Sequence, residues 1–367
     1  MKYENDERIV MTLDAGGTNF IFSAIQGNEE IVRPIRLPSH ADDLKKCLRT
    51  IVEGFEKIQS SLHEKASAIS FAFPGPADYP SGIIGDLGNL PAFRGGVALG
   101  PMLNEKFNLP VFINNDGDLF ALGEAIAGFL PEVNQLLERS GSEKRYSNLF
   151  GITLGTGFGG GIVCNGRLYM GDNSAGGEIW IMRNKLHNHC FVEEGASIRA
   201  VKRVYADKAG INLDAAPDPK EIYEIALGKA KGNQRGAVEA FRQLGETVGD
   251  ALANTLTLLD GLVVIGGGLA GAHSVFLPVI VDELNSTIST LAGDLVPRME
   301  IKAFNLEDPK SRHSFCKGSR TMIPVPMSGR HIPYDLMKRI GIGISKLGTS
   351  QAVSIGAYAF ALDKLDA

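Results

Sequence analysis

The sequence predicts an α/β protein with two layered domains, and three features of its 367 residues support this prediction. Short apolar runs typical of buried strands alternate with longer segments in which apolar residues recur every three or four positions. Glycine accounts for 44 residues, about 12% of the chain against about 7% in average proteins, and it gathers directly after the strand-like runs. The length is enough for about two domains of ~100–200 residues each. We therefore expect glycine turns at strand ends to bring the backbone close to a ligand.

The composition excludes several classes of protein. With 44% hydrophobic and 22% charged residues, the chain is expected to fold into globular domains rather than to stay disordered. Its formal net charge of −5 provides no basic field for a phosphate backbone, so we expect no nucleic-acid partner. The four cysteines form no CxxC pair, which argues against a disulfide framework and favours a cytoplasmic location; they are Cys47, Cys164, Cys190 and Cys316.

One segment is long enough and apolar enough to be considered as a membrane span. Residues 261–281 contain no Lys, Arg, Asp or Glu, but the glycines at 266–268 and Pro278 favour a buried strand, a turn and a new element. The first ten residues are mostly charged and polar, and they carry no secretory signal. We therefore expect no membrane partner.

The first domain is expected to consist of alternating strands and helices. Its apolar runs and helical periodicities predict, in order, strands at 9–13 and 20–25, an amphipathic helix at 44–58, strands at 66–73 and 111–114, and a helix from Leu119 to Ile126. The first two strands are bent tightly at the glycines between them, which predicts a hairpin.

The second half repeats the arrangement of strand, glycine turn and strand. The patterns predict a strand at 149–154, a glycine turn at 155–157, a strand at 161–163, a long helix at 238–259, and a strand at 262–265 that ends in the glycine turn 266–268. No linker separates the halves. We place the boundary near Asp116, which gives domains of residues 1–115 and 116–351, with a C-terminal helix of residues 352–367 that packs back on the first domain.

Two glycine turns are candidates for phosphate binding. Asp14-Ala15-Gly16-Gly17-Thr18-Asn19 combines a carboxylate, two glycines whose amides can approach an oxyanion, and two side chains that can donate hydrogen bonds. An ordinary glycine hairpin is the alternative. The second turn, Gly155-Thr156-Gly157, leads into another strand, which argues against a dinucleotide fingerprint because that fingerprint needs a helix there.

Asp116 is the candidate catalytic residue. It follows the strand-like run 111–114 and Asn115, and polar side chains at strand ends are often exposed in α/β folds. An aspartate at this place could accept the proton of a hydroxyl group. The residues alone give equal weight to a second role, the N-cap of the following helix.

Taken together, these motifs resemble the ROK family of sugar kinases and repressors, within the wider superfamily of actin, the heat-shock ATPases and hexokinase. The resemblance covers nearly the whole chain, and it rests on Asp14–Asn19, Gly88–Pro91, Asn115-Asp116 with 121–124, Leu154–Gly161, Ala175–Glu178 and Ile265–Gly268. It implies a two-domain actin-like ATPase (ribonuclease H-like) fold with a cleft between the domains.

The resemblance also implies an activity and a role for each motif. The activity is ATP-dependent phosphorylation of a hexose or N-acetylhexosamine hydroxyl, O6 by family habit, with Asp116 as the general base. The phosphates would meet Gly16, Gly17, Thr18 and Asn19 from one domain and Gly155, Thr156 and Gly157 from the other, with Asp14 near Mg²⁺. The adenosine would lie against Gly267 and Gly268. The sugar hydroxyls would be held by Asn89, Asn115, Asp116, Glu178 and Glu193.

One stretch departs from the family pattern. The family continues after the acidic residue with Gly-His and then a three-cysteine cluster that holds a structural zinc, whereas Glu178 is followed here by Ile179-Trp180-Ile181. In the stretch before Glu193, the possible zinc ligands are only His187, His189 and Cys190. One cysteine cannot replace the cluster of three, so we expect the zinc site to be absent. His189 is a candidate to replace the missing sugar-contacting histidine; the alternatives for His187 and His189 are exposed side chains or a residual metal site. Trp180 could line the sugar pocket, although a lone aromatic residue beside an apolar run more often belongs to the core.

Two other functions are alternatives to a kinase. A sugar-responsive repressor of the same family needs a helix-turn-helix domain, but only eight residues precede Ile9. A non-catalytic sugar-sensing protein would be expected to have lost Asp116 or one of the phosphate turns, and the chain keeps them all. Dimers are the commonest symmetric assemblies, so a homodimer is the first oligomeric state to consider.

Residues 310–346 are expected to be an insertion before the closing helix. Eight basic residues face one acid in this segment, Asp335, and its prolines and glycines favour an irregular excursion or a hairpin. A solvated surface loop or a dimer contact is the plainer interpretation. The sharper hypothesis is that the segment reaches over the cleft and contacts an anionic group of a substrate.

Overall fold

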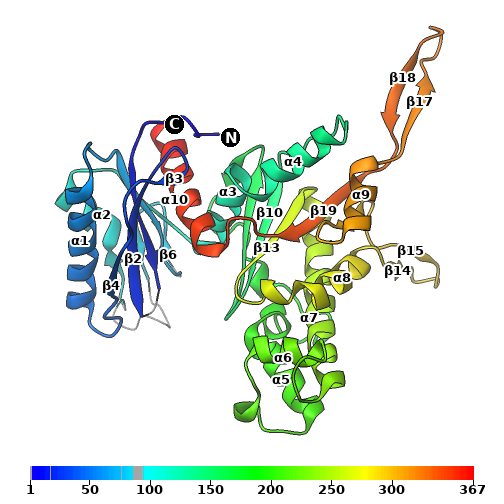
Figure 1. The fold of residues 1–367 in the computed structure, drawn as a ribbon, viewed down its shortest axis with the longest axis horizontal. Coiled ribbons are helices and arrows are strands. Elements are labelled where there is room, and N and C mark those ends of the chain that lie inside the picture. Colours follow the sequence, from blue (N-terminus) through cyan, green and yellow to red (C-terminus); the bar gives the residue numbers. More distant parts are fainter. Residues whose placement is uncertain (1, 17, 76, 86–92, 94) are drawn as a thin grey trace. The chain divides into compact units, whose positions relative to one another are not determined.

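The computed structural model describes residues 2–16, 18–75, 77–85, 93 and 95–367 (Figure 1). The chain divides into two compact units. The first unit comprises Met1–Pro131, Gly161–Gly177 and Lys346–Ala367, and the second comprises Glu132–Gly160 and Glu178–Ser345. The boundary expected near Asp116 stays a prediction.

The first unit is built on a six-stranded sheet with the order β3-β2-β1-β5-β9, in which β4 also pairs with β2. Its strands are β1 (Val10–Ala15), β2 (Asn19–Gln26), β3 (Glu29–Glu30), β4 (Ile35–Pro38), β5 (Ala68–Ala72) and β9 (Val111–Asn114). The predicted hairpin is confirmed, because β1 and β2 are antiparallel with Ala15 opposite Phe20. Strands β1, β5 and β9 are parallel neighbours, so their carboxyl ends meet at one edge of the sheet.

Helices cover both faces of this sheet (Figure 1). The predicted helix is α1 (Leu44–Ser61); its buried stripe packs in one cluster with Met11 and Leu13 of β1. Side chains that are adjacent along a strand point to opposite faces of the sheet, so Val10 lies on the face opposite to Met11. There it packs in a second cluster with Tyr358 of α10 (Thr349–Leu365). Alternate residues of β1 therefore belong to two different cores, and the sheet is buried on both sides.

Helix α10 also crosses α3 (Asp116–Ile126) at unusually short range. A Cβ atom at Gly123 would overlap the carbonyl oxygen of Ala352, and one at Gly356 would overlap the carbonyl oxygen of Leu119. The two backbones are therefore in direct contact, which only glycine permits.

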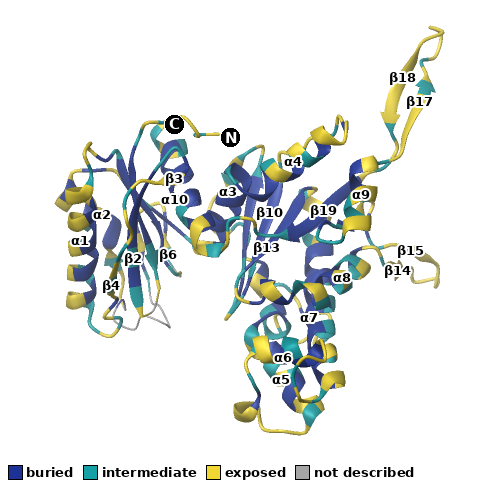
Figure 2. Ribbon diagram, in the orientation of Figure 1, coloured by how far each residue is buried: buried dark blue, intermediate teal, exposed yellow. Residues whose placement is uncertain are grey.

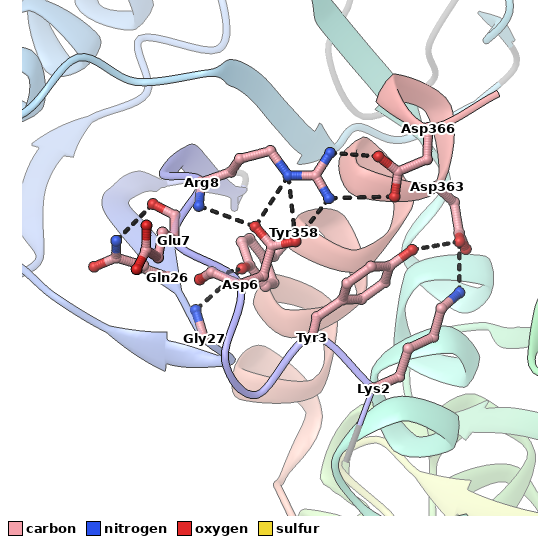
Figure 3. A network of polar contacts seen from close by, with 10 residues as sticks. All are labelled: Lys2, Tyr3, Asp6, Glu7, Arg8, Gln26, Gly27, Tyr358, Asp363 and Asp366. Carbon is pink, nitrogen blue, oxygen red and sulfur yellow. Dashed lines mark hydrogen bonds and ion pairs between the residues drawn. The ribbon is translucent and has the colours of Figure 1, made fainter.

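Polar contacts tie the first residues of the chain to the end of α10 (Figure 3). Arg8 pairs with Asp6 and with Asp366, while Lys2 and Tyr3 both donate to the carboxylate of Asp363. The hydrogen bonds from Arg8 lower the pKa of Asp6. These contacts hold the segment before β1 against the last helix.

The remaining elements of this part of the chain are short. They are a three-stranded sheet of β6 (Ala77–Asp78), β7 (Ile83–Ile84) and β8 (Val97–Ala98), helix α2 (Leu99–Phe107) and strand β12 (Arg167–Tyr169), while helix α4 (Phe129–Arg139) begins in the first unit and continues in the second.

A second six-stranded sheet has the order β12-β11-β10-β13-β19-β16. Its further strands are β10 (Leu149–Leu154), β11 (Phe158–Cys164), β13 (Leu262–Gly266), β16 (Lys302–Asn305) and β19 (Arg339–Ile344). The predicted succession of strand, glycine turn and strand is confirmed in β10 and β11. Strands β10, β13, β19 and β16 run parallel, so the glycine turns after β10 and β13 lie at the same edge.

Helices of the second unit include the predicted long helix, α7 (Gln234–Leu259). The others are α5 (Ile198–Ala209), α6 (Pro219–Ala226), α8 (His273–Leu284) and α9 (Pro309–Lys317), with the 3-10 turns η2 (Ile179–Ile181), η3 (Val192–Gly195), η4 (Leu213–Ala215) and η5 (Ala270–Ala272). Residues 261–281 form β13, a turn and most of α8, as predicted. No helix among the described residues has the length and hydropathy needed to cross a bilayer.

The segment 310–346 is more regular than the sequence predicts. It contains most of α9, the hairpin of β17 (Arg320–Pro324) and β18 (His331–Asp335), and β19, which is a buried strand between β13 and β16. Only residues 318–338, which we call the arm, project from the sheet, and they are largely exposed (Figure 2). A second exposed hairpin consists of β14 (Thr287–Ser289) and β15 (Leu295–Pro297).

The arm is anchored at its base by Arg339, whose side chain is fully buried. Its guanidinium pairs with Asp335 at 2.6 Å and donates to the backbone oxygen of Phe315 at 2.6 Å. A buried guanidinium is tolerated only when such partners compensate its lost hydration. Arg339 therefore belongs to the core, which corrects its assignment to a basic surface excursion.

Candidate active site

The carboxyl ends of three neighbouring strands bring polar groups of the first unit to one edge. Asp14 of β1 is paired in register with Ala72 of β5, and Ala72 is paired with Asn114 of β9. Because the three strands are parallel, Asp14 and the residues that follow Asn114 lie at the same end of the sheet. This places the first glycine turn and Asp116 at a common edge.

Asp116 is the first residue of α3, and the helix cap is Asn115. The side-chain oxygen Oδ1 of Asn115 accepts a hydrogen bond from the amide of Asp118 at 2.6 Å. The N-cap role, which the sequence left open for Asp116, is therefore filled by its neighbour. Asp116 accepts one hydrogen bond, from the amide of Gly117 at 3.0 Å, and water reaches its side chain.

The environment of Asp116 makes its carboxylate more basic. Although water reaches the side chain, surrounding protein desolvates the carboxylate, and this raises its pKa above the ordinary value of 3.8. The backbone amides at Gly117 and at Asp116 itself oppose the shift, and the negative charge of Asp14 adds to it. A carboxylate with a raised pKa at a strand end is suited to accept a proton.

The first glycine turn connects β1 to β2. A Cβ atom at Gly16 would lie 2.9 Å from the backbone oxygen of Asn19, so the turn has no room for a side chain there. Thr18 is exposed, and Asp14 is half-buried. Gly17 and Asn89, with the rest of the Gly88–Pro91 motif, lie outside the described residues.

The second and third glycine turns lie side by side in the second unit. Gly155-Thr156-Gly157 follows β10, Gly266-Gly267-Gly268 follows β13, and a Cβ atom at Gly155 would be 3.9 Å from the amide nitrogen of Gly268. Gly267 has a φ of +86°, and a side chain there would collide with the backbone of Leu154. The absence of side chains at these glycines would let a ligand approach the backbone closely.

Glu193 touches the second glycine turn. Its Oε2 accepts a hydrogen bond from the amide of Phe158 at 3.0 Å, and a Cβ atom at Gly157 would lie 2.8 Å from the same oxygen. Arg199 lies 3.6 Å from its other oxygen. The sequence pattern gave no signal for this contact, because 35 residues separate Phe158 from Glu193.

Glu178 and Trp180 form a polar and aromatic group on an adjacent loop. Glu178 is exposed, and one of its carboxylate oxygens accepts a hydrogen bond from the indole nitrogen Nε1 of Trp180. The Trp180 ring packs edge to face on Phe191, with ring centres 5.7 Å apart. The side chain of Trp180 is 36% exposed, so it is not the core residue that its apolar neighbours suggested.

Buried hydrogen bonds organise this loop. Asn184 is completely buried; its side-chain Oδ1 accepts hydrogen bonds from the backbone amides of Leu186 and His187, and its backbone amide donates to the carbonyl of Cys190 at 3.0 Å. Val192 donates to the carbonyl of Met182 at 2.7 Å, which closes the loop. The backbone between Glu178 and Glu193 is thus shaped by an asparagine and main-chain contacts.

The histidines of this loop are exposed. The rings of His187 and His189 are 6.5 Å apart, and Ile181, where the family pattern has histidine, is also exposed. Within the described part of the chain, no three His, Cys, Asp or Glu side chains are placed to hold a metal ion together. The absence of zinc stays a prediction. The role of His189 as a sugar ligand also stays a prediction.

We expect purified, tag-free protein to contain well under one zinc per chain, because Asn184 already supplies the hydrogen bonds that order the loop. Elemental analysis measures the zinc, and a chelator should leave the Tm unchanged. Stoichiometric zinc that is lost on replacing Cys190 by serine would contradict this expectation.

The comparison with protein families decides what kind of protein this is. The model of the ROK family matches residues 10–308, which is most of the chain. The chain belongs to the ROK family.

Proteins similar to the chain include named sugar kinases, some of them with solved structures. An N-acetyl-D-glucosamine kinase from Photobacterium profundum is 32% identical over 276 residues, which cover 70% of this chain and 83% of that protein. The crystal structure of a glucokinase from Parabacteroides distasonis is 55% identical, covers 99% of each chain and superposes with a TM-score of 0.89. A ROK glucokinase from Streptomyces griseus, crystallised with glucose and AMPPNP, is 18% identical with a TM-score of 0.58, which shows the shared fold alone.

These similarities confirm the predicted resemblance to ROK sugar kinases and the α/β actin-like fold class. They also make this ROK protein a sugar kinase.

The base of the arm and the glycine turns of the second unit lie at different edges of the sheet. The arm joins the amino end of β19, whereas the glycine turns of the second unit follow the carboxyl ends of β10 and β13. Since these strands are parallel, the arm and the turns lie at opposite edges, separated by the six residues of β19, or roughly 20 Å. The base of the arm is therefore distant from these turns, and the contact of this segment with an anionic group of a substrate stays a prediction.

Proposed function

We propose that this ROK kinase transfers the γ-phosphoryl group of ATP to the O6 hydroxyl of a hexose or N-acetylhexosamine. The hydroxyl oxygen forms a bond to the γ-phosphorus, the bond to ADP breaks, and Asp116 takes the hydroxyl proton. The observation that carries this proposal is the position of Asp116 at the same edge of the sheet as Asp14. Asp116 is the first residue of α3 but does not cap the helix, and the pKa of its carboxylate is raised.

The glycine turns are proposed to bind the nucleotide. Gly16, Thr18 and Asn19, with Gly17, and Gly155, Thr156 and Gly157 would present backbone amides and hydroxyl or amide groups to the phosphates, and Gly267 and Gly268 would accommodate the adenosine. Asp14 fits a magnesium ion, because Mg²⁺ in kinases is commonly held by one or two carboxylates together with substrate phosphates. When bound, Mg²⁺ would neutralise the charge that develops on those phosphates.

The sugar is proposed to be held by Glu178, Glu193, Asn115 and Asn89, with His189 as a further candidate. The 55% identity to a glucokinase over nearly the whole chain favours glucose as the first substrate to test, and the kinase relative at 32% identity makes N-acetylglucosamine the second. A non-catalytic sugar-sensing role is the alternative. The retained Asp116 and glycine turns argue against it.

The test is ADP release from Mg-ATP with a panel of hexoses and N-acetylhexosamines. We expect one sugar to be turned over with a kcat/KM well above the others, and phosphorus-coupled NMR of the product should place the phosphate on O6. Sugar binding without ADP release, measured by calorimetry, would support the sensor instead.

The rate should depend on pH through Asp116. Because its pKa is raised, kcat/KM is expected to fall with decreasing pH at values above those for an ordinary aspartate. Asp14→Asn removes the negative charge that contributes to the shift, so the acidic limb should move to lower pH even if kcat is also reduced. The measurement is the pH dependence of kcat/KM in both proteins. If the acidic limb of the Asp14→Asn profile lies at the same pH as in the wild type, the charge of Asp14 does not influence the pKa of Asp116.

Gly157→Ala should impair the binding of both substrates. The new Cβ atom would lie 2.8 Å from the Glu193 carboxylate, which is a proposed sugar ligand, as well as in the turn proposed for phosphate. We expect KM for sugar and for ATP each to rise about tenfold, with an unchanged Tm. A rise in KM for ATP alone would mean that Glu193 can move aside without loss of sugar binding.

A further inference from the structure

We infer that Trp180 is a positioning residue for the sugar: its indole N–H holds one oxygen of the Glu178 carboxylate, so that the other oxygen accepts a substrate hydroxyl. This inference rests on the proposed role of Glu178 as a sugar ligand. It goes beyond that role because it assigns the orientation of the carboxylate to a residue outside the ROK motifs.

The contact itself is specific in direction. Among the described residues, Trp180 is the hydrogen-bond partner that the structure gives to the Glu178 side chain. An indole nitrogen can only donate, and an ionised carboxylate can only accept, so the pair has a single arrangement. An exposed glutamate without such a partner samples several rotamers, and binding a sugar would then cost the entropy of fixing one of them.

The indole is itself held in place. Its ring packs edge to face on Phe191, and the preceding residue, Ile179, is 3% exposed and anchors the turn η2. Phe191 forms a β-bridge with Arg183, next to the buried Asn184. A chain of contacts therefore runs from the buried asparagine through Phe191 and Trp180 to the carboxylate.

This arrangement has a consequence for specificity. A carboxylate with one oxygen occupied offers the sugar one strong acceptor, which requires a hydroxyl donor at that place. A deoxy sugar that lacks the donor leaves the charged oxygen unpaired and is rejected strongly. Once Trp180 is removed, the carboxylate can turn towards water, and the rejection of the deoxy sugar should weaken.

The first experiment compares Trp180→Phe with Trp180→His. Phenylalanine keeps an aromatic ring against Phe191 but removes the donor, whereas histidine restores a ring N–H. We expect Trp180→Phe to raise KM for sugar about tenfold with KM for ATP unchanged and kcat within about threefold, and to reduce the ratio of kcat/KM between the parent and deoxy sugars. Trp180→His should recover part of both effects. Leu213→Ser, at an exposed apolar position of η4 outside the proposed site, is the matched control and should behave as wild type.

The second experiment asks whether Trp180 acts through Glu178. If it does, Trp180→Phe should cause no further loss of sugar binding in a Glu178→Ala background. Additive losses would overturn the inference, as would a Trp180→Phe variant with unchanged KM and unchanged discrimination. If Glu178→Ala leaves KM for sugar unchanged, the proposed role of Glu178 fails, and the inference fails with it. A rise in KM for Glu178→Ala without one for Trp180→Phe overturns the inference alone.

The third measurement needs no substitution of Trp180. It is the single tryptophan of the chain, so its emission reports on this loop in the intact protein. We expect the sugar alone, without nucleotide, to change the emission with a midpoint equal to the Kd from calorimetry, and Glu178→Ala to remove that change. An emission spectrum that stays constant at saturating sugar would contradict a direct link between Trp180 and the bound sugar.

Discussion

Asp116→Asn is expected to lower kcat by about 10²–10⁴ while ATP still binds. Asparagine keeps the size of the side chain and can still accept the hydrogen bond from Gly117, but it cannot take the hydroxyl proton. Because Asn115 and not Asp116 caps α3, the substitution removes no helix cap, and the fold should be unaffected. Steady-state kinetics gives kcat, and titration with a nucleotide analogue gives the affinity.

Asp207→Asn is a suitable control, since Asp207 is an exposed aspartate in the last turn of α5. It should retain wild-type kinetics. If Asp116→Asn keeps more than a tenth of the wild-type kcat, another group must accept the proton.

Gly356→Val is expected to destabilise the protein by about 3 kcal/mol or more. The valine side chain would have to occupy the space of the Leu119 carbonyl, so α10 and α3 would be forced apart. Because α3 begins at Asp116, the displacement should also reduce kcat in the protein that remains folded. Denaturant unfolding, monitored by circular dichroism, measures the loss of stability.

Gly271→Ala provides the comparison, because nothing lies within 4 Å of a Cβ atom at that position. We expect its stability to change by less than about 0.5 kcal/mol, as for most surface substitutions. Equal losses for the two variants would mean that the α3–α10 crossing is not a tight contact in solution.

Much of the fold could be predicted because local patterns and packing agree. The helical stripe that contains Cys47, Ile51 and Phe55 is buried as a unit, and the apolar runs around both glycine turns form the expected strands. The residues after these strands were recognisable because glycine and polar side chains interrupt apolar runs where a parallel sheet ends. The family motifs could therefore be found before their geometry was known.

The errors have a common physical cause, which is that burial depends on partners distant in the sequence. The sequence assigns β19 to an excursion because it starts with Arg339 and alternates glycine with isoleucine, yet Asp335 and the carbonyl of Phe315 accept hydrogen bonds from the buried guanidinium. The contact of Glu193 with Phe158 and the hydrogen bonds of Asn184 could not be predicted from the sequence either, since no local sequence pattern marks them. For Trp180 the sequence left open a place in the sugar pocket or in the core, and its 36% exposure argues against the core.

The position of α10 also affects how the protein can fold while it is being synthesised. The face of the first sheet that contains Val10, Ile25 and Ala68 is covered by Tyr358, Ala361 and Leu362 of this helix. More than 220 residues separate the end of α3 from the start of α10, and at about 5–20 residues per second the ribosome needs roughly 10–45 s to add them.

Until α10 has been synthesised, the apolar face of the first sheet that this helix covers stays exposed to water. An N-terminal domain usually folds while the rest of the chain is still being synthesised. The first unit cannot complete its fold in this way, because α10 is part of its core. Nascent chains that stop before Thr349 should bind a holdase or aggregate, whereas chains released after Leu365 should not.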